Sequence, residues 1–305
     1  MFETTRDNEP EFATVLRRWC LDRFNGMTDV GPFSAAMWHE VGQLGLLGLG
    51  TPEGGGAVSD IVIAMETFGH VGYCGPLVPT FVAGQLLDER DRRGIDEGRD
   101  LAAVDFGQRT IAWAGAASIY VEIDLESWQA WRCEPTSPPC SRPTMSGEPW
   151  ASISLQRQAC LGDARHAVAV GLVAQAAYLV AAGLRMIGEA ARYAHERVQF
   201  GSSIGTFQAV SHPLADSWAR LDAARAMVRD VASDDVPDST RAARAQLAAA
   251  RHAVDAAYRA YQTFGGMGFA TENHVATMGL RIREVSLVGP PKEVVQREAL
   301  GGSGL

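Results

Sequence analysis

The stretch Gln262-Thr-Phe-Gly-Gly-Met-Gly-Phe-Ala-Thr-Glu272 follows directly on a long helical pattern near the C-terminus. Residues 240–264 are rich in Ala and Arg, and the spacing of the apolar positions predicts an amphipathic helix from Thr240 to Phe264. The Gly265-Gly266 pair is expected to end this helix, because glycine readily adopts the backbone angles of a helix C-cap. The patterns on either side of this stretch decide the fold class.

Long helices are predicted upstream of this stretch, and short ones downstream. Side chains such as those of Asp and Thr favour helix starts, because they accept hydrogen bonds from the unpaired backbone N–H groups of the first turn. The expected segments are a helix from Asp163 or a neighbour to about Val198, a turn from Gly201 to Gly205, a helix N-capped by Thr206 that reaches about Ala232, and two shorter helices divided by Gly289-Pro290-Pro291.

The N-terminal third is also predicted to be helical, whereas the middle of the chain is not. Residues 110–113, 118–123, 128–132 and 150–155 are rich in β-formers or alternate apolar and polar side chains, which indicates a small antiparallel β-domain. The expected N-terminal helices run from Glu11 to Phe24, from about Ser34 to Leu44, from an N-cap at Ser59 through Phe68, and onward from Pro79.

This order of helices, a short β-segment and a helical bundle is typical of an α+β fold that is mostly α. We divide the chain into an N-terminal helical domain (1–90), a β-domain (91–161) and a C-terminal helical bundle (162–305). A chain of 305 residues can bury a substantial core across such domains.

Composition excludes several classes of function. A net charge of -9 and a pI of about 5.3 argue against binding to nucleic acid. Five scattered cysteines without a CxxC pair favour neither a metal site nor a disulfide framework, so we expect a cytoplasmic protein. The polar N-terminus does not resemble a signal peptide. The apolar run from Ala167 to Met186 contains Gln175 and small residues, and is interpreted as a buried bundle helix and not a membrane span.

Three stretches together resemble the acyl-CoA dehydrogenase family. Residues 197–208, Arg-Val-Gln-Phe-Gly-Ser-Ser-Ile-Gly-Thr-Phe-Gln, are similar to that family's Arg-x-x-Phe-Gly signature with its following Phe-Gln or His-Gln pair. The stretch from Gln262 to Glu272 resembles its flavin-clamping motif. Residues 38–56, with the turn Pro52-Glu-Gly-Gly-Gly, and then Glu66-x-x-Gly69, resemble its N-terminal third. The matches span nearly the whole chain in the family's order.

The resemblance implies an N-terminal helical domain, a central β-domain and a C-terminal bundle, assembled as dimers or tetramers. It also implies that the C-terminal signatures reach across the dimer interface to the ADP half of the neighbour's FAD. By this resemblance Arg197 pairs with pyrophosphate oxygens, a task that suits a guanidinium fork. The remaining implied contacts are Gln199, Phe200 and Gln208 at the adenosine end, Gln262 as a hydrogen-bonding partner, and Gly265 and Gly266 where backbone approaches the phosphates.

Each of these residues also has a plainer interpretation. Arg197 follows Tyr193 by one helical turn and is also explained as a solvated residue at a helix end. Phe200 is also explained as a core residue, and Gly265-Gly266 as a helix stop.

The family's catalytic base is not found where it is expected. An ungapped alignment puts the usual Glu at Gly289, and glycine cannot accept a proton. Glu284 and Glu293 are the nearest carboxylates, and neither is a convincing substitute. Some family members place the base on the first long C-terminal helix, but the corresponding residues 167–173 include no carboxylate. Residues 91–161 are also about half of the expected length and lack the strand pair that contacts the flavin ring.

These departures resemble the smaller subunits of heteromeric (α2β2) acyl-CoA dehydrogenases of actinobacterial steroid catabolism. The chain is therefore interpreted as a non-catalytic subunit that shares FAD with a second, catalytic acyl-CoA dehydrogenase subunit. That partner would hold most of the acyl-CoA, and an electron-transfer flavoprotein would accept the electrons. Two alternatives remain open: a homomeric dehydrogenase with a relocated base, and a flavin-free scaffold of the same fold.

Overall fold

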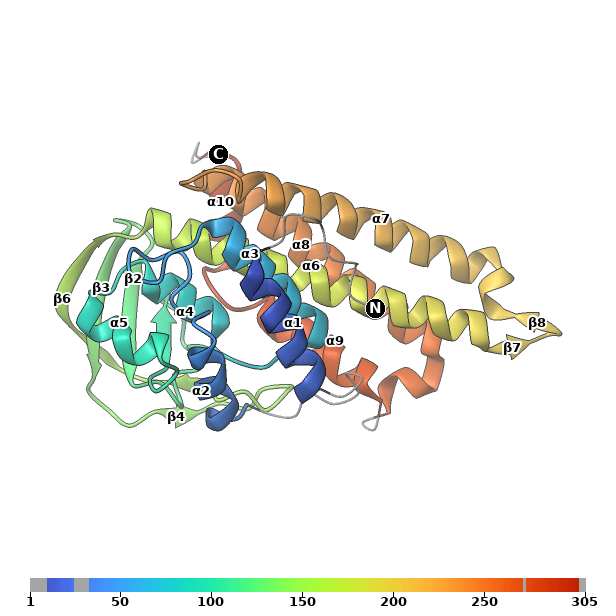
Figure 1. Ribbon diagram of the computed structural model, residues 1–305, viewed down its shortest axis with the longest axis horizontal. Coiled ribbons are helices and arrows are strands. Elements are labelled where there is room, and N and C mark those ends of the chain that lie inside the picture. Colours follow the sequence, from blue (N-terminus) through green and yellow to red (C-terminus); the bar gives the residue numbers. More distant parts are fainter. Residues whose placement is uncertain (1–9, 25–32, 271–272, 302–305) are drawn as a thin grey trace.

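The computed structural model describes residues 10–24, 33–270 and 273–301. Figure 1 shows a small sheet at one end of the molecule and a bundle of long helices that extends to the other, with N-terminal helices packed across the sheet end and the middle. This arrangement is the predicted α+β fold, mostly α, with a C-terminal helical bundle.

Helices α1 to α5 precede the sheet, and the first four confirm the helical N-terminal third. Ser34 caps α2 as predicted, since its Oγ accepts a hydrogen bond from the Met37 N–H (3.3 Å). Ser59 does not cap α3; the N-cap is Ala57, whose N–H donates to the Asp60 carboxylate (2.8 Å). The bounds are α1 Glu11–Arg23, α2 Ala35–Gln43, α3 Val58–Val71, α4 Leu77–Gly84 and α5 Glu89–Asp96.

The main sheet has the strand order β1-β2-β3-β6 and is mixed, so the prediction of a purely antiparallel β-domain is wrong. Strand β1 pairs in parallel with β2, and the other two pairings are antiparallel. The predicted strand at 110–113 is a turn with one bridge, Ile111 to Ala151. The bounds are β1 Ala102–Asp105, β2 Ile119–Asp124, β3 Gln129–Pro135, β4 Cys140–Ser141, β5 Ala151–Ser152 and β6 Leu155–Asp163.

The C-terminal helices lie close to the predicted positions, but one predicted cap is wrong. Asp163 is the last residue of β6 and accepts a hydrogen bond from the Arg165 N–H (2.9 Å), and its neighbour Ala164 is the N-cap of the next helix. Thr206 donates its hydroxyl to the Ser203 carbonyl (2.7 Å), and Phe207 is the N-cap of α7. The bounds are α6 Arg165–Glu196, β7 Val198–Gln199, β8 Ser202–Ser203, the 3-10 helix η1 Ile204–Thr206, α7 Gln208–Val231, α8 Ser239–Phe264, the 3-10 helix η2 Gly265–Phe269, α9 His274–Val285 and α10 Lys292–Ala299.

Helix α6 is the central core helix, which confirms the interpretation of residues 167–186. It is long and apolar enough to cross a membrane, but 94% of its apolar window is buried inside the protein. Small residues let its neighbours approach: a Cβ on Gly69 of α3 would lie 2.2 Å from the Tyr178 carbonyl oxygen. A Cβ on Gly183 would meet Leu221 of α7 and Ala253 of α8 at about 3 Å. The bundle is thus built around one buried helix that reaches from the sheet to the far tip (Figure 1).

Candidate functional site

A short hairpin at the tip of the bundle carries the first group of predicted site residues. Arg197 is the C-cap of α6, and Gln199 lies in β7. The turn residues Phe200 and Gly201 both have positive φ angles, +53° and +83°, as a two-residue type I′ hairpin turn requires. Few residues other than glycine adopt this conformation, and such strain often marks a functional site. The turn holds the Phe200 ring almost wholly in solvent, with 95% of the residue exposed, so the core interpretation of Phe200 is wrong.

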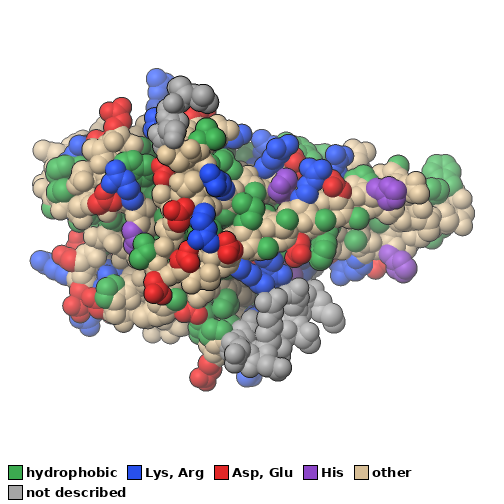
Figure 2. Space-filling model, turned by 90° about the horizontal axis from the view of Figure 1, so that it is seen from above, with side chains coloured by type: hydrophobic (Ala, Val, Ile, Leu, Met, Phe, Trp, Pro, Cys, Tyr) green, Lys and Arg blue, Asp and Glu red, His purple; other side chains and the backbone are tan. Residues whose placement is uncertain are grey.

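Gln208 joins this group from the first turn of α7. The residue before it, Phe207, contacts the Phe200 ring edge-on with the ring centroids 6.2 Å apart. Gln208 itself is exposed. The hairpin and the start of α7 therefore bring Arg197, Gln199, Phe200 and Gln208 together on one exposed tip, which is the narrow end of the molecule in Figure 2.

The second group lies where α8 ends, beside the end of α6. Phe264 of α8 stacks on Tyr193 of α6 with centroids 4.5 Å apart, which fixes the two helix ends against each other. Gly265 ends α8 with φ +61° and ψ -140°, and so confirms the predicted stop. A Cβ on Gly265 or Gly266 would meet no atom within 4 Å, so open space surrounds both glycines. Gln262 is exposed one turn earlier, and Glu272 of the same motif lies outside the described residues.

The electrostatics of the tip favour an anion. The Arg197 side chain is exposed and makes no ion pair or hydrogen bond with any described residue. By contrast, Arg185 and Arg192 of the same helix both pair with Glu189. An exposed guanidinium without a carboxylate partner is free to bind phosphate oxygens bidentately. Among the described residues, no cluster of His, Cys, Asp or Glu is arranged to hold a metal ion.

Gly289 lies in a different part of the molecule from both groups. It follows α9, whose 12 residues rise about 18 Å, and it adopts φ +103°. The Gln108 side chain donates to its carbonyl oxygen (3.2 Å). The cavity beside it has a volume of only about 10 Å³ and is lined mainly by side chains of α4 and the sheet region: Val78, Pro79, Val82, Val104, Phe106, Gln108, Ala112, Trp150, Leu287 and Val288.

A buried pair of glutamines forms hydrogen bonds that hold the turn before Gly289. Gln175 of α6 donates to the carbonyl oxygens of Val285 and Val288, both at 2.5 Å. Gln246 of α8 in turn donates to the Gln175 side-chain oxygen (2.8 Å). Because these groups are buried, losing either glutamine would leave unsatisfied carbonyls. The conformation of the turn is therefore fixed by side chains of α6 and α8.

No carboxylate lines the small cavity beside Gly289. Glu284 is buried and is committed to Ser146, whose N–H (2.8 Å) and hydroxyl both donate to it. Glu293 is exposed on α10. The residues 167–173 of α6 are buried and apolar, and a Cβ on Gly171 would lie 2.3 Å from Val82. None of the alternative positions for a base brings a carboxylate to this cavity.

The C-terminal bundle matches a known protein family. Residues 161–303 match the acyl-CoA dehydrogenase C-terminal domain. Over these residues the chain resembles the acyl-CoA dehydrogenase family. It is 29% identical over 270 residues to the acyl-CoA dehydrogenase IpdE2 of Mycolicibacterium smegmatis, which covers 84% of each protein. It is 28% identical over 277 residues to the IpdE2 protein of Mycobacterium tuberculosis, covering 84% of this chain and 82% of that one.

Solved structures of acyl-CoA dehydrogenases share the fold of this chain. A steroid acyl-CoA dehydrogenase variant, Tcur3481-Tcur3483, superposes with a TM-score of 0.75 at 21% identity, covering 96% of this chain and 98% of that one. The ChsE4-ChsE5 complex from Mycobacterium tuberculosis superposes with a TM-score of 0.76 at 17% identity, covering 99% and 100%. Butyryl-CoA dehydrogenase from Megasphaera elsdenii gives a TM-score of 0.77 at 19% identity, covering 98% and 99%.

Sequence analysis missed a buried acidic cluster. Burial raises the pKa of Glu148 to about 7, although Trp150 Nε1 donates to its carboxyl group (3.0 Å). The Cys74 thiol contacts the other carboxyl oxygen (3.6 Å), and Glu284 and Arg281 lie close enough to shift the same pKa. These partners come from distant parts of the chain, so no local pattern predicts them.

Sequence analysis also missed a cleft of about 560 Å³ between α7 and α8, adjacent to Gln262 and Gly265. The Tyr261 hydroxyl donates to the Ala276 carbonyl (3.0 Å) and so ties this region to α9. Burial raises the pKa of Tyr261 to about 12, which keeps its hydroxyl a donor at neutral pH. The other lining residues are Asp216, Ser217, Arg220, His252, Asp255, Tyr258, Arg259 and Phe269.

Proposed function

We propose that this chain is a non-catalytic subunit of a heteromeric acyl-CoA dehydrogenase. It would contribute contacts to the ADP half of an FAD whose flavin ring, catalytic base and acyl-CoA belong to a second subunit. The observation that carries the proposal is the contrast between two regions of the molecule, the exposed candidate site and the closed region around Gly289. The residues that we propose contact the ADP half of FAD are exposed, whereas the cavity beside Gly289 is closed and is lined by no carboxylate.

The residues at the tip and at the end of α8 fit the phosphate-bearing half of FAD. Arg197 offers a free guanidinium for the pyrophosphate. Gly265 and Gly266 present backbone with open space around it, which suits the close approach of phosphate oxygens. Gln199, Gln208 and Gln262 supply exposed amides for polar contacts, and Phe200 supplies an exposed ring for the adenosine end. FAD, when bound, would supply the hydride acceptor of the complex.

This chain has no room for a flavin ring of its own beside Gly289. Ligand pockets typically enclose about 300–1,000 Å³. The cavity of about 10 Å³ at Gly289 holds one water molecule at most. The Gln108 contact and the buried Gln175–Gln246 pair fix the wall of that cavity, so it has no evident route to opening. We infer that the catalytic half of the site lies in the partner.

The relatives suggest the substrate class and the assembly. One structural neighbour is a steroid acyl-CoA dehydrogenase, and another is the ChsE4-ChsE5 complex. By analogy with these, we propose an α2β2 assembly that acts on a steroid-derived acyl-CoA in the cytoplasm and passes electrons to an electron-transfer flavoprotein. We also propose that residues 1–90, 91–161 and 162–305 act as helical, β and FAD-contacting domains.

Co-expression with a neighbouring acyl-CoA dehydrogenase gene tests the proposal. We expect little flavin on this chain alone, and a yellow complex of both chains that acyl-CoA thioesters bleach. The thioesters would range from butyryl-CoA to a steroid side-chain CoA ester. A yellow protein active without a partner would favour a homomeric enzyme. A colourless protein with every partner tried would favour a scaffold.

A further inference from the structure

Two segments carry the residues that we propose contact FAD, and each segment begins at the last turn of a long helix. Arg197 is the C-cap of α6, and its N–H donates to the Tyr193 carbonyl oxygen (2.8 Å). Gly265 is the C-cap of α8, directly after Phe264, and its N–H donates to the Tyr261 carbonyl oxygen. The two segments are far apart along the chain, so tertiary contacts between the helix ends set the distance between them.

The last turns of α6 and α8 meet through a pair of aromatic rings. The Tyr193 ring stacks on the Phe264 ring, with the centroids 4.5 Å apart and the ring planes 24° apart. The other side chains buried in these last turns are all small, namely Ala190, Ala194, Ala253, Ala256, Ala257 and Ala260. Methyl groups offer little contact area compared with two stacked rings, so the stack dominates the contact between the helix ends.

The hairpin that follows Arg197 is attached closely to the same turn of α6. The Ser203 hydroxyl donates to the Ala194 carbonyl oxygen (2.6 Å), and the Ile204 N–H donates to the Arg197 carbonyl oxygen (2.8 Å). A Cβ on Gly205 would lie 3.2 Å from the Ala194 carbonyl oxygen, so the backbone of the hairpin lies against the helix. The position of the hairpin therefore depends on that of the last turn of α6.

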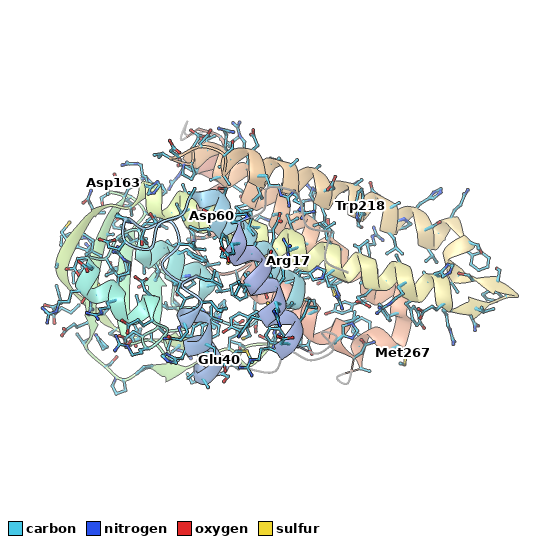
Figure 3. All side chains as sticks on the ribbon, in the orientation of Figure 1. Arg17, Glu40, Asp60, Asp163, Trp218 and Met267 are labelled. Carbon is cyan, nitrogen blue, oxygen red and sulfur yellow. The ribbon has the colours of Figure 1, made fainter. Side chains whose placement is uncertain are left out.

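The segment η2 is attached to the end of α8 in the same way. A Cβ on Gly268 would lie 3.1 Å from the Phe264 Cβ and 3.2 Å from the Tyr261 Cα. Figure 3 labels Met267 of this segment, toward the same end of the bundle as the β7–β8 hairpin of Figure 1. The position of the Gly265 backbone therefore depends on that of Phe264.

We propose that Tyr193 and Phe264 are positioning residues for FAD. Their stack sets the separation between Arg197 and Gly265, so that both segments reach the same cofactor, and neither ring touches it. A ligand that is held from two sides loses affinity when the separation of the two sides changes, because it can then satisfy only one of them. This inference rests on the proposed function, since it concerns the same site.

The affinity of the complex for FAD tests the role of the stack. FAD is removed from the purified complex with the catalytic partner and titrated back, and flavin fluorescence gives the Kd. Tyr193→Leu and Phe264→Leu each remove the stack and keep an apolar side chain. We expect each to raise the Kd about threefold to tenfold, the factor that the loss of an aromatic pair typically causes. Tyr193→Phe keeps the stack and should leave the Kd unchanged.

A double-mutant cycle separates positioning from an independent contact. If the stack acts through the placement of Arg197, Tyr193→Leu should have little further effect once Arg197 is gone. We expect the double variant Tyr193→Leu/Arg197→Ala to bind FAD within about twofold of Arg197→Ala alone. Effects that multiply in the double variant would overturn the proposal. A defect in Tyr193→Phe as large as that in Tyr193→Leu would also overturn it.

Ile187→Val is the matched control for a loss of packing, because Ile187 is buried in α6 and is not part of the stack. It should lower the urea midpoint of the complex, as Tyr193→Leu does, and leave the Kd for FAD unchanged. An equal rise in Kd would mean that FAD affinity follows the stability of the bundle, and would overturn the proposal. An unchanged Kd in Arg197→Ala would refute the proposed FAD contact and this inference with it. A weakened Arg197→Ala beside an unaffected Tyr193→Leu would overturn this inference alone.

Discussion

Phe200 and Arg197 show how a single position can favour ligand contact over stability. A ring that is 95% exposed buries almost no apolar surface, so it contributes little to folding, and its positive φ angle costs free energy. Arg197 likewise has no partner among the described residues. Both residues belong to a sequence motif, so sequence alone could name them as site candidates. Sequence could not predict their exposure, since it depends on a turn at the end of a 32-residue helix.

Replacing Arg197 with Ala should weaken FAD retention without unfolding the chain. A hydrogen bond to a charged group is worth roughly 1.5–3 kcal/mol, so we expect affinity to fall about tenfold to a hundredfold. Flavin absorbance of the complex after dialysis measures this. Arg165→Ala is the matched control, because Arg165 is exposed at the opposite end of α6, about 48 Å away. Equal FAD retention in both variants would mean that Arg197 does not contact FAD and is only a solvated residue at the end of a helix.

Glu148→Gln should reduce the dependence of stability on pH. The folded-state pKa of Glu148 is about 7, above its ordinary value of 4.5, so the folded protein binds this proton more tightly than the unfolded chain. Binding of this proton stabilises the folded protein fully below about pH 4.5, and this stabilisation is lost as the pH rises through about 7. Each unit of difference between the folded and unfolded pKa corresponds to about 1.4 kcal/mol in the free energy of unfolding. Glutamine has no proton to lose. The Tm of the variant minus the Tm of the wild type should therefore be higher at pH 8 than at pH 5.

Glu126→Gln serves as the control for this pH measurement, because Glu126 is exposed in the turn between β2 and β3. We expect its Tm difference from wild type to be the same at pH 5 and pH 8. If Glu148→Gln behaved in the same way, Glu148 would not titrate in this window. Sequence could not identify Glu148, because its partners Cys74 and Glu284 are 74 and 136 positions away along the chain.

At the scale of helices and strands, the positions of most helices could be predicted from the sequence. Fewer of the strand positions and strand pairings could be predicted. The long helices are periodic and end at glycines or prolines, so their positions follow from local chemistry. Strand β1 was missed because its four residues, Ala102–Asp105, are too few to show alternation and are fixed by pairing with β2. Thr206 was expected to cap α7, but its hydroxyl donates to Ser203 within η1 instead. Caps and short strands depend on such competing partners.

The crossing of α3 and α6 predicts opposite effects for two glycine substitutions. Gly69→Ala should destabilise the fold, because its Cβ would lie 2.2 Å from the Tyr178 backbone oxygen and overpacking typically costs about 1–3 kcal/mol. Gly188→Ala should stabilise it by about 0.5–1 kcal/mol, since Gly188 is exposed in α6 and open space surrounds it. Urea midpoints of the purified complex would separate the two. A stabilising Gly69→Ala would mean that these helices do not pack this closely.

Across the whole molecule, two regions differ in what they offer to a ligand. The bundle presents an exposed tip with the residues that we propose contact FAD. The meeting point of α4, the sheet and the turn after α9 is closed around Gly289. The sequence led us to predict a missing base and a short β-domain, since both predictions follow from matching motifs along the chain. It could not show that the space is filled, because the filling side chains come from residues 78–82, 104–112 and 150.

The last prediction concerns Gly289→Glu in the co-expressed complex. Restoring the carboxylate should create no second active site, because a base acts only beside a flavin ring and an acyl-CoA, and a cavity of about 10 Å³ admits neither. The variant should also lose stability, since φ +103° is a conformation that glutamate adopts poorly. Counting FAD per pair of chains, together with bleaching by acyl-CoA, measures the outcome. We expect one FAD per pair and the same bleaching amplitude in variant and wild type. Two FAD per pair, or a larger amplitude in the variant, would mean that this subunit forms a working flavin pocket, and the proposed non-catalytic role would then rest on the missing carboxylate alone.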